Sequence, residues 1–157
     1  MEQTVHRQDG PRPILMTQNP KESDLDPSLD QKLTHSALLF EADVLDHLVE
    51  REPDNVAYLA ALGQAFSKLK KHERGLAIDR RLVVNRPNDP TFRYNLACSL
   101  VLTGDLDGGC RELLEAIELG YRDFDHLFKD TDLSMLRSDP RFKKVETRIS
   151  EVSPPSE

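Results

Sequence analysis

The chain has 157 residues, of which 38% are hydrophobic and 31% are charged, a composition that indicates one globular domain with tails. The formal net charge of −7 excludes a general nucleic-acid binder, because neutralising phosphates requires clustered Lys and Arg. No apolar run approaches the ~20 residues that cross a bilayer, and the first residues lack the basic and apolar regions of a secretion signal. We therefore expect a cytoplasmic protein that binds neither nucleic acid nor membranes.

The N-terminal part of the chain divides into a leader and a long helix. Residues 1–25 are polar and contain several Pro and Gly residues, which predicts a disordered leader, and residues 26–150 form the predicted helical domain. Pro27 suits the first turn of a helix that covers about 28–51 and ends before Pro53. Its apolar residues recur at helical spacing: Leu29, Leu33, Ala37, Phe40, Val44, Leu45 and Leu48.

A pattern with a period of 34 residues follows, marked by turns at Pro53 and Pro87. Helices over 55–70 and about 73–85 form the first predicted pair, and helices over 90–103 and about 107–119 form the second, giving full repeats at about 55–87 and 89–121. Matching residues stand 34 apart at Leu62/Leu96, Gly63/Ala97, Phe66/Leu100 and Gly75/Gly109. Small residues at the paired positions indicate that the two helices of a unit cross closely. Such a period is typical of helix–turn–helix units that stack side by side.

The C-terminal part departs from this period after Tyr121. We expect a short helix near Phe124, a further turn from Asp132 to Leu136, and a last helix opened by Asp139 and Pro140. Its apolar stripe consists of Phe142, Val145 and Ile149. Residues 122–150 would cap the stacking face of the last pair, and residues 151–157 are predicted to be a disordered tail.

The repeated residues resemble the tetratricopeptide repeat family over about 33–121, as a short, degenerate array with a C-terminal cap of the bacterial type. Leu59 and Arg93 stand where the family favours an aromatic residue, and Tyr121 stands where it favours Pro. The resemblance implies an all-α, right-handed α–α superhelix, in which two full helix pairs are flanked by an N-terminal helix and C-terminal capping helices.

The resemblance also implies that the first helix of each pair lines a concave groove for a peptide or helix of another protein. Carried over residue by residue, the groove positions are Ala57, Ala60, Gln64, Ser67, Lys68, Thr91, Tyr94, Cys98, Val101 and Leu102. We expect the partner segment to insert against Gln64, Tyr94 and Cys98, with Lys68 available to an acidic group of the partner. In the alternative interpretation the C-terminal helix of the chain itself fills the groove, and Val101 and Leu102 belong to the core.

Residues that could carry chemistry form no recognisable constellation. The five His residues are scattered, without the spacing of a metal site. Asp123, Asp125, Asp130 and Asp132 cluster near a short helix but lack the Gly and Glu of a calcium loop, so we interpret them as helix caps and solvated carboxylates. Cys98 and Cys110 are interpreted as free thiols rather than a redox pair.

The sequence thus predicts a non-catalytic protein–protein interaction module without cofactor or metal. Two alternatives stay open. The first is self-association through an outer face, such as that of the 28–51 helix, which would make the chain a scaffold or homo-oligomer. The second is an enzyme whose site the sequence does not reveal.

Overall fold

The computed structural model describes residues 27–153, and within that range the fold is all-α, with helices and no strand. The leader predicted for 1–25 and the last tail residues, 154–157, lie outside the described residues. The elements are α1 (Pro27–Arg51), α2 (Val56–Lys68), α3 (His72–Asn85), α4 (Pro90–Leu102), α5 (Leu106–Glu118), α6 (Phe124–Lys129), the 3-10 helix η2 (Thr131–Leu133), α7 (Ser134–Arg137) and α8 (Phe142–Val152). The last helix runs past the predicted tail boundary at 151, because Val152 packs against the same apolar cluster as Ile149.

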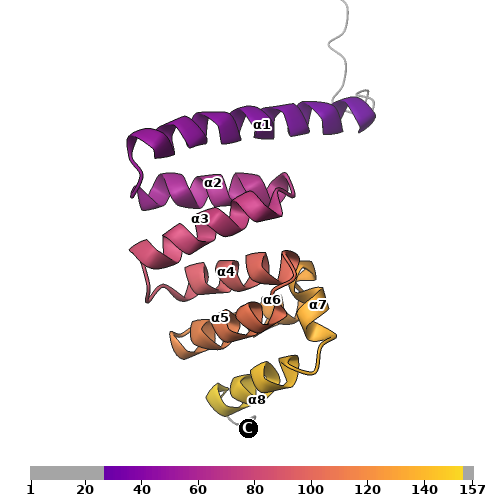
Figure 1. The fold of residues 1–157 in the computed structure, drawn as a ribbon. Helices are drawn as coiled ribbons and strands as arrows, with labels where there is room; N and C mark the ends of the chain where they lie inside the picture. Colours follow the sequence, from indigo (N-terminus) through magenta and orange to yellow (C-terminus); the bar gives the residue numbers. More distant parts are fainter. Residues whose placement is uncertain (1–26, 154–157) are drawn as a thin grey trace, which may run out of the picture.

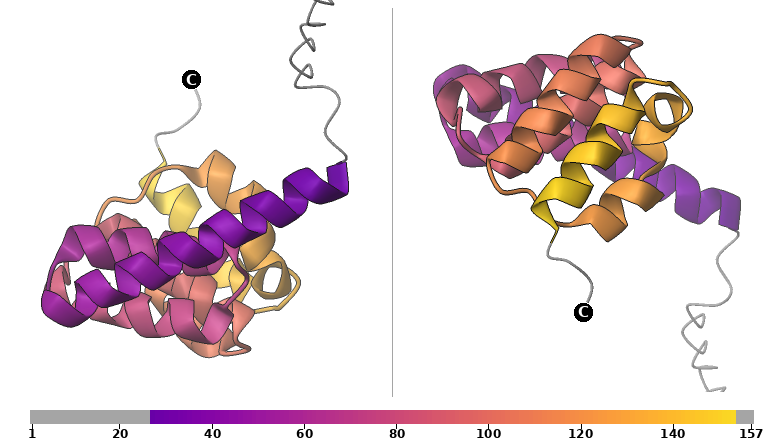
Figure 2. Two further views of the ribbon diagram at one scale, coloured as in Figure 1. Left: turned by 90° about the horizontal axis from the view of Figure 1, so that it is seen from above. Right: turned by 90° about the horizontal axis from the view of Figure 1, so that it is seen from below.

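Helices α1 to α5 form a column in chain order, α8 lies at its far end against α5, and α6 and α7 lie beside α4 and α5 (Figure 1). Each of α1 to α4 packs against the next helix, and α8 packs against α5. Viewed from above, the N-terminal part of α1 projects beyond the helices beneath it (Figure 2). None of the helices in residues 27–153 is both long and apolar enough to cross a membrane.

Three helix starts are fixed by side chains that satisfy the free backbone N–H groups of the first turn. Asn55 accepts hydrogen bonds from the amides of Ala57 and Tyr58 at the start of α2. Asp89 does the same at α4, where Pro90 occupies the first turn, and Asp105 caps α5. These polar residues explain why the predicted and observed starts of α2, α4 and α5 differ by one residue at most.

The helix ends repeat a left-handed turn. Gly104, with φ of +94°, ends α4, and the amide of Asp105 then bonds the carbonyl of Leu100. At the equivalent position 34 residues earlier, Lys70 adopts φ of +54°, and the amide of Lys71 bonds the carbonyl of Phe66. A residue with a Cβ is disfavoured in this conformation, so α2 ends on a strained residue where α4 ends on glycine.

Replacing Lys70 with glycine is therefore expected to raise the free energy of unfolding by about 0.5–1 kcal/mol. The reverse exchange, Gly104→Lys, is expected to lower it by at least as much. Urea titration followed by circular dichroism measures both changes. An unchanged midpoint for Lys70→Gly would show that the turn after α2 is not strained.

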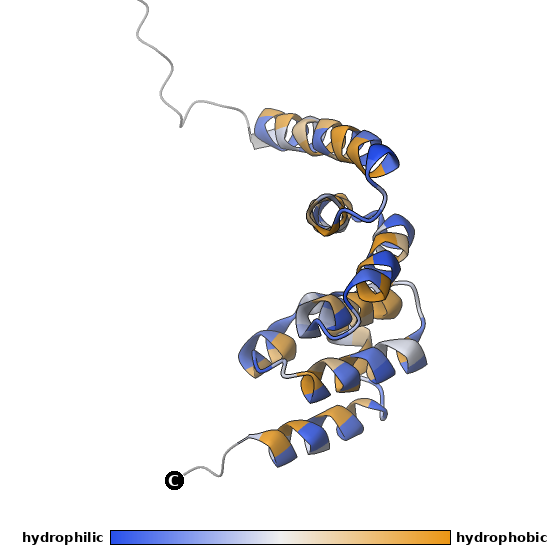
Figure 3. Cartoon of the chain, turned by 90° about the vertical axis from the view of Figure 1, so that its left-hand side faces the viewer, coloured by the Kyte–Doolittle hydropathy of each residue, from blue (hydrophilic) through white to orange (hydrophobic). Residues whose placement is uncertain are grey.

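Apolar residues fill the space between successive helices, and Figure 3 shows apolar and polar residues alternating along the helices. One cluster joins α1, α2 and α3 (Ala42, Val49, Leu59, Leu62, Ala65, Phe66, Ile78 and Leu82). A smaller one joins α3 to α4 (Leu76, Val83, Leu96 and Leu100). The largest joins α4 and α5 to the C-terminal segment, whose Leu127, Leu133, Leu136 and Val145 are fully buried. The segment after α5 therefore covers the face that the second pair would otherwise expose.

Candidate functional site

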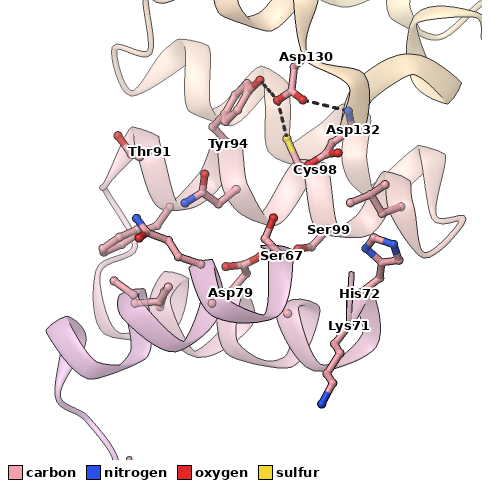
Figure 4. Close-up of a pocket in the computed structure, with 18 of the residues that line it drawn as sticks. Ser67, Lys71, His72, Asp79, Thr91, Tyr94, Cys98, Ser99, Asp130 and Asp132 are labelled. Carbon is pink, nitrogen blue, oxygen red and sulfur yellow. Dashed lines mark hydrogen bonds between the residues drawn. The ribbon is translucent and has the colours of Figure 1, made fainter. Parts of the chain in front are cut away.

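A cavity of about 400 Å³ lies between α2 and α4, with α3 as its floor and the segment from α6 to η2 as its end wall (Figure 4). A volume of this order is within the range of ligand sites in proteins. Its lining comes from α2 (Ala60, Gly63, Gln64, Ser67), from α3 and the residue before it (Lys71, His72, Gly75, Asp79, Leu82), from α4 (Thr91, Phe92, Tyr94, Asn95, Cys98, Ser99, Leu102) and from the C-terminal segment (His126, Asp130, Asp132).

Most of the residues predicted to form the groove border this cavity. They are Ala60, Gln64, Ser67, Thr91, Tyr94, Cys98 and Leu102. Gln64, Ser67 and Thr91 are exposed at its mouth, whereas Tyr94 and Cys98 are buried. The first helices of the two predicted pairs, α2 and α4, thus both border this cavity.

Three of the predicted residues lie elsewhere. Ala57 and Lys68 are exposed on α2 but do not line the cavity, and Lys71 is the lysine at its edge. Val101 is fully buried and faces α5, because its Cγ2 lies 2.5 Å from the place that a Cβ of Gly109 would occupy. Val101 is therefore a core residue.

Tyr94 is held in place by the C-terminal segment. Only 4% of its surface is exposed, its hydroxyl donates a 2.6 Å hydrogen bond to Asp130, and its ring stacks on Tyr121 with centroids 4.4 Å apart. Burial raises the pKa of Tyr94, so the phenol stays protonated and remains a donor at neutral pH. Tyr94 serves chiefly as a support for the end wall, and little of its ring is open to a ligand.

Asp130 is the centre of this end wall. Its carboxylate also lies 3.7 Å from Cys98 Sγ and 3.5 Å from His126 Nε2, and it accepts a hydrogen bond from the amide of Asp132. Asp130 thereby caps η2, as Asp123 caps α6, which agrees with the interpretation of these aspartates as helix caps. The sequence did not indicate that two of them would also border the cavity.

Cys98 and Cys110 are both free and buried. Burial and the charges of Asp130 and Asp132 raise the pKa of Cys98, and burial raises that of Cys110. Because the thiolate is the reactive form, neither residue has the environment of a nucleophile.

We accordingly expect both thiols to react with an aromatic disulfide reagent at pH 8 only as fast as the native chain opens. Absorbance of the released thiolate follows the reaction, and the same sample in concentrated urea supplies the two-thiol reference. A rapid burst of one thiol equivalent from the folded protein would contradict the assignment of Cys98 as an inert, buried residue.

Asp79 is the buried charged residue on the cavity floor. It lies on α3 with 8% of its surface exposed, and Ser99 Oγ donates a 2.5 Å hydrogen bond to its Oδ2. Burial raises the pKa of this carboxyl group. Burial and the charge of Asp130 also raise the pKa of Asp132 in the end wall. Sequence reasoning missed Asp79, because a helical aspartate is ordinarily solvent-exposed.

Among residues 27–153, no group of three or more His, Cys, Asp or Glu side chains is placed to hold a metal ion.

No protein-family model matches the sequence. Among curated proteins, the chain is similar to a chloroplastic protein of Arabidopsis thaliana, with 29% identity over 92 residues. The matched region covers 57% of this chain and 28% of that relative, so the chain spans well under a third of its length. This similarity is too partial to assign the chain to a family.

Proposed function

We propose that this protein is a non-catalytic interaction module of tetratricopeptide-like, superhelical architecture, which holds a peptide or helix of a partner protein in the cavity between α2 and α4. The 34-residue register supports the architecture, because the helix caps and the left-handed turns at Lys70 and Gly104 recur in it. The degenerate repeats and the packed C-terminal segment fit a short array that is closed by its own cap.

The observation that carries the proposal is the cavity itself, which the equivalent first helices of the two pairs form together. At its mouth the exposed amides of Gln64 and Asn95 come from opposite helices. A carboxamide donates and accepts hydrogen bonds, so these two side chains can pair with the backbone of an extended segment. Phe92 and Leu102, which are partly buried, add apolar surface for its side chains.

Site-specific photo-crosslinking in native cell extract tests this proposal. A photoreactive residue at Gln64 is expected to give a discrete adduct with a partner protein. The matched control carries the same residue at Val84, which is 81% exposed on α3 and away from the cavity, and should give none. Equal adducts from both positions, or adducts from Val84 alone, would contradict binding in the cavity.

A second candidate function, self-association, is favoured by one observation on α1. Leu29, Leu33, Phe40 and Val44 are 42–70% exposed, although α2 covers Ala42 and Val49 on the same helix. Helical spacing places these two sets on opposite faces, so α1 has one apolar face that no described element covers.

Sedimentation velocity separates the two candidates. If the chain self-associates through α1, the wild type has an apparent mass of two or more chains. The Phe40→Asp variant then has the mass of one chain. A single-chain mass at all concentrations would leave binding in the cavity as the sole candidate.

A further inference from the structure

The 34-residue register shows that Asp79 replaces an apolar residue. The equivalent positions are Leu45, which packs on the cluster of α1 to α3, and Leu113, which is fully buried. Its partner Ser99 likewise stands where α2 carries the buried Ala65. The two positions that are apolar in the preceding repeat, Leu45 and Ala65, are thus occupied beside the cavity by a carboxylate and a hydroxyl.

This replacement is costly for the fold. Removing a carboxylate from water costs several kcal/mol unless hydrogen bonds and an opposite charge offset the loss. Asp79 has one hydrogen bond, from Ser99, and no ion pair with any residue in the described part of the chain. Packing alone would favour leucine here, so the carboxylate calls for another explanation.

The second oxygen of Asp79 borders the cavity. No described residue donates a hydrogen bond to Oδ1, which lies 3.5 Å from the place that a Cβ of Gly63 would occupy. Gly63 has no side chain that could cover this oxygen, and both residues line the cavity. Asp79 is therefore a carboxylate in the cavity lining that is more than nine-tenths buried, and its Oδ1 accepts no hydrogen bond from a described residue.

The rest of the lining does not neutralise this charge. Asp130 and Asp132 add two carboxylates, and the carboxylate of Asp132 has no hydrogen bond or ion pair among residues 27–153. Lys71 contributes its stem to the edge, but its ammonium points away from the three aspartates (Figure 4). His72 and His126 are the other lining residues that can carry a positive charge, so the cavity lacks a fixed cation among its carboxylates.

We propose that the cavity recognises a lysine or arginine side chain of the bound partner segment, whose cationic head pairs with Asp79 while its aliphatic stem lies along the apolar wall. This inference rests on the proposed function and gives it a chemical preference. From the sequence, an acidic group of the partner is expected to bind Lys68. Lys68 lies outside the cavity, however, and the proposed partner group is basic. A buried carboxylate without a counter-ion favours a cation strongly, because the ligand supplies the missing charge and donors together.

The test starts with a library of random dodecapeptides displayed on phage, selected on the full-length wild-type protein. Enriched peptides are expected to share a Lys or Arg at one position. A synthetic copy with that residue changed to Met should bind about tenfold or more weakly. Asp79→Asn keeps the shape of the side chain and removes its charge. Its affinity for the original peptide should fall by a similar factor, and its affinity for the Met copy should be almost unchanged. Asp125→Asn, at an exposed position of α6 outside the cavity, is the matched control and should bind normally.

A second variant separates lost binding from lost folding. Asp79→Leu/Ser99→Ala restores the apolar pair found at Leu45 and Ala65 in the same register. We expect its melting temperature to rise by about 2–8 °C while peptide affinity falls. Weaker binding by a more stable protein cannot be attributed to unfolding.

The outcomes distinguish this inference from the proposed function. Enriched peptides without a basic residue, or full affinity for Asp79→Asn, would overturn the cation preference and leave groove binding in place. Failure to enrich any peptide, or peptides that bind undiminished to a cavity-filling Ser67→Trp variant, would overturn both.

Discussion

Truncating Leu136 to alanine is expected to lower the free energy of unfolding by about 2–5 kcal/mol. Leu136 lies on α7, a helix of four residues, and is fully buried in the cluster that joins α4 and α5 to the C-terminal segment. A helix this short has little stability of its own, so the side chain it buries holds it in place. The truncation leaves a cavity in the largest cluster of the protein.

The matched control is Met135→Ala, one residue earlier on the same helix. Met135 is 55% exposed, so we expect a change within about 0.5 kcal/mol. Urea denaturation measures both variants. A loss of less than about 1 kcal/mol for Leu136→Ala would mean that the C-terminal segment is only loosely attached to α4 and α5.

Gly75 and Gly109 occupy the same position of the 34-residue repeat, yet we expect their replacement by alanine to change the free energy of unfolding in opposite directions. A Cβ on Gly109 would lie 2.5 Å from Val101 Cγ2 and 3.2 Å from the carbonyl oxygen of Ala97. Val101 is fully buried and stiff about χ1, so Gly109→Ala should separate α4 from α5 and cost about 1–3 kcal/mol. A Cβ on Gly75 has its nearest neighbours at 3.9 Å, an ordinary contact.

Gly75→Ala is therefore expected to stabilise the protein by up to about 1 kcal/mol, the gain in helix propensity over glycine. Thermal unfolding of the two variants side by side measures the difference. If both substitutions destabilise the protein equally, the crossing of α2 and α3 is as close as that of α4 and α5. The expected difference in space around Gly75 and Gly109 is then wrong.

The helices were largely predictable because their signals are local. Asp89 followed by Pro90, and Gly104 after an apolar run, mark the limits of α4 by capping chemistry and backbone sterics that act within one turn. The stripe of Phe142, Val145 and Ile149 likewise predicted a buried face on α8, which the structure confirms.

The site was less predictable because the cavity depends on contacts between distant segments. Asp130 and Asp132 come directly after α6 in the sequence, far from the residues of α2 and α4. They border the cavity because the C-terminal segment folds back onto α4. Val101 was placed in the groove by its register, but the absence of a side chain at Gly109 lets it pack toward α5. Comparing Asp79 with Leu45 and Leu113 would have exposed one polar residue at an apolar position, and this signal was already present in the sequence.

The most direct test of binding between α2 and α4 is a nuclear magnetic resonance titration of the isotope-labelled full-length chain with a peptide from the phage selection. We expect the amides of Gly63, Gln64, Asn95 and Ser99 to shift in a saturable manner, while those of Leu33 and Phe40 on the outer face of α1 stay in place. Shifts confined to α1, with the cavity amides unmoved, would contradict the cavity as the partner site and assign that role to the exposed face of α1.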